Sequence, residues 1–511
     1  MREQFFNIKQ NREIRQNLIA MKAELKETQA AAVLWELFAE EPEVLLTQLQ
    51  SEDAKIRKHT ALILGALGSE SCRDALWDAY QRENQRFVRS AYLTGLQGCD
   101  CAGFLTDFRM REKELLSQER TPETEKHISE ELEALHALIY QYEKPDGHRF
   151  TGWARPSEVI LTTHRAYREV TADQIQKGTK KLLGAGVKVC DADLEELCTI
   201  RTWRELLFCL ELPRVACLEL PQGVGEAGTG TIRKETAAEQ LLASNLLKLL
   251  EELHEGKAPY RFRIECKGTM TLEERSAFTK KLASRLEAGT KGKLVNSTSD
   301  YEIELRLIET KQGGILPLLK LYTLSDKRFS YRKNSVAASI QPVHAALMME
   351  LASPYLKEEA RVLDPFCGVG TMLLERNYRM HADTLYGVDL YGPAVAGARE
   401  NAQIARVPAH YINKDFFSFT HEYLFDEIVT NLPVKGKTMT GHELDFLYGK
   451  FFDKAEQMVK PGGLLLLYSH DKAFVKKQLR EHKSMKLLKE WLIGDKEGSW
   501  FFAVRYQPAG K

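Results

Sequence analysis

The sequence of 511 residues lacks any apolar run of 18 or more residues, and its opening Met-Arg-Glu-Gln-Phe-Phe-Asn-Ile-Lys contains no apolar core of a signal peptide. A membrane-spanning helix needs about 20 consecutive, mostly apolar residues, and a secretory signal needs an apolar stretch near the N-terminus. We therefore expect a cytoplasmic protein without a membrane partner.

Cysteine is also scarce: the nine cysteines are scattered through apolar stretches such as 207–210 and 215–218. Cysteines of this kind are typical of reduced core residues in a protein without disulfides. Cys99 and Cys101 form the one close pair, but no second pair and no histidine cluster follows at the spacing of a zinc finger. We therefore expect no metal site.

The chain has no excess of charge of either sign, because 72 basic residues balance 72 acidic ones. A protein that binds nucleic acid usually shows a basic surface. The balance neither supports nor excludes RNA binding, and any basic surface must be local.

A glycine-rich turn is the most informative feature that is present. Residues 362–371 read Val-Leu-Asp-Pro-Phe-Cys-Gly-Val-Gly-Thr, which is an apolar strand that ends in an acid and is followed by a turn and a helix-like segment. Glycines let the backbone approach a ligand where a Cβ atom would collide. In an open α/β sheet, ligands bind at the carboxyl ends of the strands. The pattern predicts a cradle for a small ligand.

Further strands follow in an order that strengthens this prediction. A strand at 385–389 ends in Asp389, where an acid can bind a ribose diol. Later strands are predicted at 411–415, 427–430 and 464–468, and a closing antiparallel hairpin is predicted from 486–492 and 499–506. Strands and helices alternate throughout, which predicts a Rossmann-like α/β domain with a mixed sheet of seven strands.

Together, Asp-Pro-Phe-Cys-Gly-x-Gly-Thr, Val-Asp-Leu, Lys-Asp-Phe, Asn-Leu-Pro and Lys-Pro-Gly-Gly resemble the motifs of class I methyltransferases that use S-adenosylmethionine. The resemblance is greatest to the THUMP-containing RNA guanosine-N2 methyltransferases, strong over 335–511 and weaker over 155–334. It implies that S-adenosylmethionine is the cofactor and that Cys367 has a packing role. The cofactor residues that it implies are Asp364, Phe366, Gly368, Gly370 and Thr371 in the turn, Asp389 and Leu390 at the ribose, and Asp415 and Phe416 near the adenine.

The same resemblance implies that Asn431, Leu432, Pro433 and Val434 form the catalytic segment. Methyl transfer to an exocyclic amine needs acceptors that hold the amine hydrogens, so that the nitrogen lone pair points at the methyl group. The family has an aromatic residue where this chain has Val434, and base stacking on a ring is worth ~1–3 kcal/mol. The candidates for a substitute ring are Phe416, His442 and Phe446.

Residues 1–145 show helical periodicity almost without strand signals. The segments 51–68 and 87–96 resemble two HEAT repeats, with Arg57 and Arg89 separated by 32 residues. We expect an all-α HEAT-like domain that offers an added surface for RNA or for a protein partner. A helical bundle with a chance repeat is the alternative.

The middle of the chain is predicted as α+β. Residues 155–220 resemble a ferredoxin-like lobe, 221–234 are a linker whose Gly-x-Gly-x-x-Gly at 223–228 is a chance match, and 235–333 resemble a THUMP domain, which in the family grips tRNA-like acceptor stems. Within 326–333, cations are interleaved with Phe329 and Tyr331, as in segments that contact phosphates and stack bases. The RNA-binding candidates are Lys327, Arg328, Arg332 and Lys333.

These features predict a methyltransferase that acts on the N2 amine of a guanosine in RNA, with tRNA as the first choice. Three alternatives remain open: the same reaction on ribosomal RNA, a non-catalytic RNA-binding protein that retains the cofactor fold, and adenine-N6 methylation of DNA. Val434 motivates the non-catalytic alternative, and the DNA alternative leaves the THUMP-like region without a role.

Overall fold

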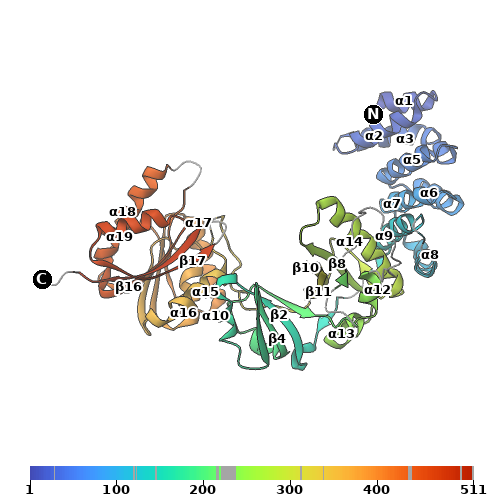
Figure 1. Ribbon diagram of the computed structural model, residues 1–511. Coiled ribbons are helices and arrows are strands. Elements are labelled where there is room, and N and C mark those ends of the chain that lie inside the picture. The colour runs from blue at the N-terminus through green and yellow to red at the C-terminus, as the bar shows by residue number, and fades with distance from the viewer. Residues whose placement is uncertain are drawn as a thin grey trace, which may run out of the picture. The chain divides into compact units, whose positions relative to one another are not determined.

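The computed structural model describes residues 1–27, 29–118, 121, 123–143, 147–213, 218–219, 237–310, 314–337, 339–435, 440–494 and 498–508 (Figure 1). Contacts divide the chain into two compact units, of which the first comprises Met1–Gly152 and Leu210–Thr323 and the second Trp153–Cys209 and Leu324–Lys511. The predicted linker 221–234, with its glycine motif, lies outside the described residues. Over the described ranges, no helix is long and apolar enough to cross a membrane.

The first unit begins with helices, as the sequence predicted. They are α1 (Arg2–Lys9), α2 (Ile14–Glu24), α3 (Ala30–Glu40), α4 (Glu43–Leu46), α5 (Ala54–Leu67), α6 (Glu70–Arg82), α7 (Arg86–Leu96), α8 (Leu105–Ser117) and α9 (Glu125–Tyr142). Their buried apolar side chains form one continuous core. Figure 1 shows these helices following one another from blue at α1 to cyan at α8 and α9. Their assignment to the HEAT family stays a prediction.

The two predicted repeats are tied together at α5 and α7. Arg57 donates two hydrogen bonds of 2.8 Å to the buried carboxylate of Glu83, and Arg89 donates one of 2.9 Å to the backbone carbonyl of the same residue. A Cβ atom on Gly65 would lie 2.5 Å from the backbone of Gly95. Only glycine at this crossing lets the two helices pack so closely.

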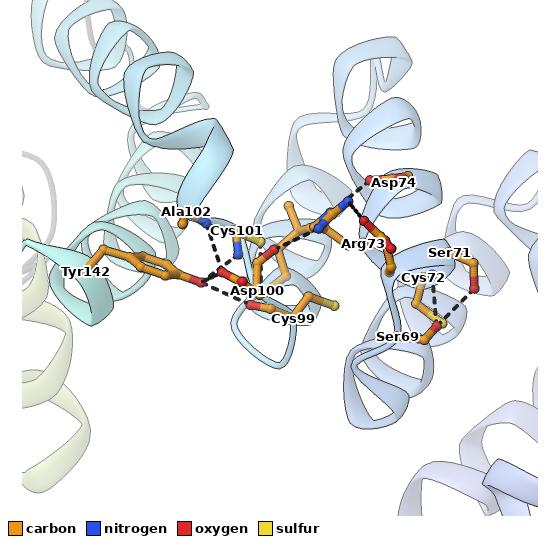
Figure 2. A network of polar contacts seen from close by, with 12 residues as sticks. Ser69, Ser71, Cys72, Arg73, Asp74, Cys99, Asp100, Cys101, Ala102 and Tyr142 are labelled. Carbon is orange, nitrogen blue, oxygen red and sulfur yellow. Dashed lines mark hydrogen bonds and ion pairs between the residues drawn. The ribbon is translucent and has the colours of Figure 1, made fainter.

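Cys99 and Cys101 lie in the turn after α7, where Figure 2 shows them beside Tyr142. The backbone N–H of Cys101 donates a hydrogen bond of 2.6 Å to the Tyr142 hydroxyl, and the Cys101 thiol donates to the carbonyl of Leu96. Burial raises the pKa of the Cys99 thiol to about 11 and that of Cys101 to about 12. Both thiols are therefore protonated at neutral pH, and among the described residues no group of three metal-ligating side chains occurs.

The first unit continues with the predicted THUMP-like part. Strand β8 (Tyr260–Lys267) pairs in parallel with β9 (Leu294–Asn296) and β10 (Ile303–Glu309), and β10 pairs antiparallel with β11 (Gly314–Leu321). Helix α14 (Leu272–Gly289) begins at a capping box of Thr271 and Glu274. The predicted strand, helix and strand therefore occur in this order. The unit also contains α12 (Ala237–Leu242), α13 (Leu246–Leu253), the short pair β1 (Arg149–Phe150) and β7 (His254–Glu255), and β6 (Leu218–Glu219), which pairs with β11.

The second unit begins with the predicted ferredoxin-like lobe. Strands β3 (Thr179–Leu183), β4 (Gly186–Ala192), β2 (Ser157–Thr162) and β5 (Glu205–Cys209) lie side by side in this order, all antiparallel. The short helices α10 (Arg168–Ala172) and α11 (Leu194–Leu197) connect them.

The C-terminal part is a seven-stranded mixed sheet of order β14-β13-β12-β15-β16-β18-β17. Side chains alternate between two cores: Leu464 and Leu466 face one, and Leu465 and Leu467 face the other. Both faces are thus buried, as the apolar run predicted. The strands are β12 (Ala360–Asp364), β13 (Ala382–Asp389), β14 (His410–Asn413), β15 (Phe425–Asn431), β16 (Val459–Ser469), β17 (Met485–Gly494) and β18 (Ser499–Tyr506), and the helices are α15 (Pro342–Ala352), α16 (Thr371–Arg379), α17 (Gly392–Ala405), α18 (Gly441–Met458) and α19 (Lys472–Glu481).

The compact units differ from the predicted domains in two respects. Residues 210–213 and 218–219, predicted as the end of the ferredoxin-like lobe, group with the first unit, where β6 pairs with β11. Residues 324–333, predicted as the end of the THUMP-like domain, group with the second unit. The reason is local: the guanidinium of Arg328 donates hydrogen bonds of 2.9 Å to the carbonyls of Ile200 and Trp203 in the lobe. The boundaries 1–145, 155–220, 235–333 and 335–511 stay predictions.

Candidate cofactor and substrate site

Four parallel strands end at the same edge of the C-terminal sheet. Strand β12 pairs with β13 on one side and with β15 on the other, and β13 pairs with β14. Their parallel direction brings the predicted residues Asp364, Asp389, Asp415 and Asn431 to one edge, because each of them ends or directly follows its strand. This is the edge where open α/β sheets bind ligands.

The glycine turn after β12 has the backbone that the sequence predicted. Gly368 has φ of +51° and Gly370 of +83°, a region that residues with side chains rarely adopt. A Cβ atom on Gly370 would lie 2.4 Å from the hydroxyl oxygen of Tyr411, whereas one on Gly368 would meet no atom within 4 Å. Gly370 is therefore required by close contact, and the backbone at Gly368 borders open space.

Asp364 is fully buried at the end of β12. Its carboxylate accepts a hydrogen bond of 2.6 Å from the Thr430 hydroxyl and one of 3.1 Å from the Phe366 N–H. Burial raises the pKa of Asp364 to about 7, the two hydrogen bonds oppose this rise, and the negative charge of Asp389 adds to it. An added positive charge at this edge would favour the ionised form.

Asp389 joins two loops of the same edge. One of its oxygens accepts a hydrogen bond of 2.8 Å from the Gly368 N–H, and the other accepts one of 2.8 Å from the Tyr391 N–H. Each carboxylate oxygen has a further lone pair. The carboxylate therefore fixes the glycine turn and retains acceptor capacity toward a diol. Leu390 beside it is 75% exposed.

Asp415 and Phe416 follow β14. Asp415 is exposed and accepts a hydrogen bond of 3.0 Å from the Phe417 N–H. Phe416 is buried, with its ring centroid 5.8 Å from that of Phe366 in the glycine turn and 6.2 Å from that of Phe451 on α18. Phe416 therefore supports this edge from within, and its ring is not available to stack a target base.

Two buried hydroxyl groups beside the glycine turn indicate that a polar ligand fits there. The Thr371 and Tyr411 hydroxyls are buried beside Gly370, and neither has a hydrogen-bond partner within the described part of the chain. Buried polar groups in native proteins are normally satisfied. A ligand with polar groups would meet this need, so the residues present fit S-adenosylmethionine. Burial raises the pKa of the Cys367 thiol well above its usual range, which agrees with a packing role and not with a nucleophile.

The Asn431–Val434 segment leaves the end of β15. Asn431 is half-buried, and the N–H of Leu432 donates a hydrogen bond of 2.9 Å to the carbonyl of Tyr468 on β16. The carbonyl of Pro433 accepts one of 3.1 Å from the hydroxyl of Tyr448 on α18. Val434 is 39% exposed. The segment is thus held on both sides before it leaves the described residues at 436–439.

An exposed aromatic ring lies on α18, the helix that holds this segment. Phe446 is 61% exposed, and the Lys450 ammonium lies 5.0 Å from its ring centroid and 5.7 Å from that of Phe417. Phe417 in turn neighbours Phe366, at 6.4 Å between ring centroids. Phe366, Phe417 and the Lys450 ammonium therefore connect the glycine turn with the exposed ring of Phe446.

The predicted RNA-binding segment is only partly exposed. Arg328 is buried, stacks at 3.1 Å on the ring centroid of Trp203 and forms an ion pair with Asp326. Its assignment as an RNA contact is therefore wrong, because its donors are already used inside the protein. Tyr331 is buried too, and its hydroxyl donates to Glu375.

The other three cations of this segment remain accessible. Lys327 and Lys333 are exposed, and Arg332 is half-buried. Their assignment as RNA contacts stays a prediction.

Three residues that organise the site were not predicted from the sequence: Thr430, Tyr411 and Tyr448. Tyr448 has a weak sequence signal, because its polar hydroxyl stands among apolar residues at helical spacing, such as Leu444 and Phe451. Thr430 and Tyr411 lie in apolar strands, and nothing in the sequence distinguishes them from ordinary core residues.

Comparisons with known proteins agree with this geometry. Residues 330–495 match the UPF0020 family, described as an RMKL-like methyltransferase domain. A tRNA (guanine(10)-N2)-dimethyltransferase of Methanothermobacter thermautotrophicus is 31% identical over 137 residues, which are 25% of this chain and 38% of that protein. The chain thus matches well under half of the length of this relative.

Among solved structures, TrmN from Thermus thermophilus is similar with a TM-score of 0.51 and 19% identity, over 68% of this chain and 99% of that one. SMU.472, a putative methyltransferase complexed with SAH, has a TM-score of 0.49 and 14% identity, over 70% and 99% of the two chains. At this identity the likeness to TrmN shows the fold. The match over residues 330–495 and the seven-stranded mixed sheet agree with the S-adenosylmethionine-dependent methyltransferase domain that the sequence predicted for the C-terminal part of the chain.

Proposed function

We propose that this protein transfers a methyl group from S-adenosylmethionine to the exocyclic N2 amine of a guanosine in tRNA. The observation that carries the proposal is the Asn-Leu-Pro segment at the end of β15, beside the glycine turn at the end of β12. The 31% identity with a tRNA guanine-N2 dimethyltransferase supports guanine and tRNA as the target.

Residues at the carboxyl ends of β12 and β13 would bind the cofactor. When bound, S-adenosylmethionine supplies an electrophilic methyl group on a sulfonium sulfur. Gly368 and Gly370 would leave room for it, the carboxyl group of Asp364 would provide negative charge for its ammonium group, and Asp389 would accept hydrogen bonds from its ribose.

The Asn431–Val434 segment orients the target amine. The amide oxygen of Asn431 and the carbonyl of Pro433 would accept the two amine hydrogens, which directs the nitrogen lone pair toward the methyl carbon. The amine held by these two acceptors would take the methyl group that the cofactor supplies and would then release a proton to water. Tyr448 assists by fixing the Pro433 carbonyl through its hydrogen bond.

Phe446 is the best candidate for the ring that Val434 does not provide. Phe416 is buried, whereas Phe446 is exposed on α18, two residues before Tyr448. Stacking on such a ring would offset part of the cost of extruding a base from the RNA. His442, also exposed, lies one turn earlier on the same helix.

RNA is also proposed to contact the THUMP-like part and Lys327, Arg332 and Lys333. These side chains are exposed or half-buried, and cations of this kind bind phosphates without reading the sequence. The THUMP-like α/β arrangement of 235–333 supports this role.

The proposal is tested by incubating the purified protein with labelled S-adenosylmethionine and with tRNA and ribosomal RNA from cells that lack the gene. Nucleosides from the labelled RNA are then separated by mass spectrometry. We expect N2-methylguanosine in tRNA. If this product formed only in ribosomal RNA, the substrate would be ribosomal RNA and not tRNA. No labelling of either RNA above background would refute the activity.

A further inference from the structure

The second helices of the two N-terminal repeats carry cations but no acids. Helix α5 contains Lys55, Arg57 and Lys58, and α7 contains Arg86 and Arg89, with neither Asp nor Glu in either helix. Four of the five lie in the first turn, where the helix macrodipole favours acids and disfavours cations. Both helices thus place cations where acids are preferred, and such departures from local preference are typical of functional surfaces.

Structure explains only part of this pattern. Arg57 and Arg89 bind Glu83 and hold the repeats together. Lys55 and Lys58 have no such role, because no hydrogen bond or ion pair links either side chain to an acid in the described part of the chain. Lys55 is exposed and Lys58 is half-buried, so neither charge is neutralised within the described residues.

Helix α2 packs against α5 and adds two more cations, Arg15 and Lys22. The charges of Lys22, Lys58 and Arg15 all act on the imidazole of His59 and, together with burial, lower its pKa, while Asp53 acts in the opposite sense. The cations of the two helices therefore lie near one another. We call Arg15, Lys22, Lys55 and Lys58 the α2–α5 cationic surface.

Three other cations of the same helical region have counter-ions. Arg2 pairs with Glu36 at 3.1 Å, Lys9 pairs with Glu41, and Arg82 pairs with Asp78 at 3.3 Å. For the α2–α5 cationic surface no such pair occurs within the ranges that the structure describes. Like charges held together without a counter-ion repel one another, so this arrangement favours a polyanion as partner.

The surface chemistry favours nucleic acid over an acidic protein. Energetic centres of protein interfaces are enriched in Trp and Tyr as well as Arg, and they lie in apolar pockets. On α2 and α5 the exposed large apolar side chain is Ile19 alone, and no aromatic side chain is exposed there. Phosphate binding needs cations and no apolar anchor.

The surface also belongs to the same compact unit as the THUMP-like part. Helices α5, α7 and α9 pack in succession, and α9 packs against α14, where the Ser129 hydroxyl donates a hydrogen bond of 2.7 Å to Ser284 (Figure 1). One RNA molecule bound to the THUMP-like part can therefore continue along these helices.

We propose that the α2–α5 cationic surface binds the phosphate backbone of the RNA substrate. The inference rests on the proposed function, because it takes RNA as the substrate. It gives the helical extension a role that does not depend on the nucleotide sequence, since phosphate contacts position an RNA without reading its bases.

The test compares full-length wild type with Lys22→Glu/Lys58→Glu, using total tRNA as the probe in a fluorescence anisotropy titration at several KCl concentrations. At low salt the variant should bind at least tenfold more weakly than wild type. The negative slope of log affinity against log salt should become less steep by about 1.5, as expected for two lost phosphate contacts. The matched control Arg82→Glu/Lys113→Glu changes two exposed cations on α6 and α8 and should bind like wild type.

Two further measurements keep the outcomes apart. Lys22→Gln/Lys58→Gln removes the charges without reversing them and should give a smaller loss in the same direction, while melting temperature and cofactor affinity stay unchanged in both variants. If wild type binds tRNA and both variants bind it with the wild-type affinity and salt slope, the inference is overturned and the proposed function stands. If wild type itself neither binds nor methylates RNA, the proposed function fails and the inference fails with it.

Discussion

The hydroxyl of Thr430 on β15 donates a hydrogen bond of 2.6 Å to the carboxylate of Asp364 on β12. The two residues come from neighbouring strands of the sheet, so this contact joins the strand that enters the glycine turn to the strand that enters the Asn-Leu-Pro segment. The cofactor side and the acceptor side of the site are thus connected through one buried carboxyl group.

The first prediction follows from the ionisation of Asp364. Its pKa is about 7 in the folded protein and about 4 in an unfolded chain, so the folded state holds the proton between these values. The free energy of unfolding that Asp364 contributes should therefore fall as pH rises from about 4 and level off above about 7. Urea unfolding of wild type and Asp364→Asn at pH 5, 6.5 and 8 measures this contribution. As pH rises, the free energy of unfolding of wild type should fall relative to that of the variant.

The exposed Glu358→Gln controls for the loss of a carboxylate. A stability difference between wild type and Asp364→Asn that stays constant with pH would show that Asp364 ionises normally.

The second prediction concerns Tyr448, whose hydroxyl lies 3.1 Å from the Pro433 carbonyl and 2.9 Å from the Ser469 hydroxyl. Tyr448→Phe should lower stability by about 1 kcal/mol, the usual value of one hydrogen bond. It should also lower kcat several-fold without changing cofactor affinity, because the Pro433 carbonyl loses its support. Tyr423→Phe removes a hydroxyl that donates to Tyr386 and lies before the start of β15, at the opposite end of this strand from Pro433, and should leave kcat alone. Equal rates for both variants would contradict the positioning role.

The third prediction separates two neighbouring cations. Arg328→Met removes the partner of Asp326 and of two backbone carbonyls, and it should lower stability by about 2 kcal/mol with little effect on the salt dependence of tRNA binding. Lys327→Met changes an exposed side chain and should do the reverse, with unchanged stability and a lower salt slope. Chemical unfolding and tRNA titrations at several salt concentrations measure both. A lowered salt slope in Arg328→Met alone would restore the original assignment.

Much of the site was accessible from the sequence because parallel topology places every strand end at one edge. An acid after each apolar run, as at Asp364 and Asp389, is therefore sufficient to predict which side chains meet. The positive φ of Gly370 was predictable for a similar reason, since only glycine tolerates it without strain.

Partners across the sheet or between domains were not predictable. Arg328 stands in a basic run that looks solvated, and Trp203, which covers it, is distant in the sequence. Likewise, the Thr430–Asp364 bond joins residues 66 apart in the chain. Such pairs depend on strand register and domain packing, which local periodicity does not encode.

The fourth prediction concerns the acceptor side of the reaction. Asn431→Ala should lower the rate of methyl transfer by about 100-fold while cofactor affinity stays near normal, because the contact matters chiefly in the transition state. Asn413→Ala provides the contrast: its amide donates hydrogen bonds of 2.9 Å to the carbonyls of Asp389 and Leu390, so its loss should weaken cofactor binding. Single-turnover kinetics and calorimetry distinguish the two effects. Weak cofactor binding by Asn431→Ala would remove it from the acceptor role.

The last prediction concerns the stacking ring. If Phe446 stacks the target base, Phe446→Ala should lower kcat/KM for tRNA by about tenfold, within the ~1–3 kcal/mol range of base stacking, and Phe446→Tyr should keep most of it. Met110→Ala removes another exposed apolar side chain, on α8, and should have no effect. Steady-state kinetics with tRNA and saturating cofactor measures each variant.

Val434→Phe then tests where the ring belongs. In the wild-type background a second ring would collide with the stacked base and slow turnover, whereas in Phe446→Ala it would provide the missing surface and restore activity. Because the same substitution acts in opposite directions in the two backgrounds, a general effect on folding cannot mimic the result. If Val434→Phe instead raises activity in wild type from near background, Phe446 is not a stacking residue, and the natural Val434 leaves the site without a surface for the base.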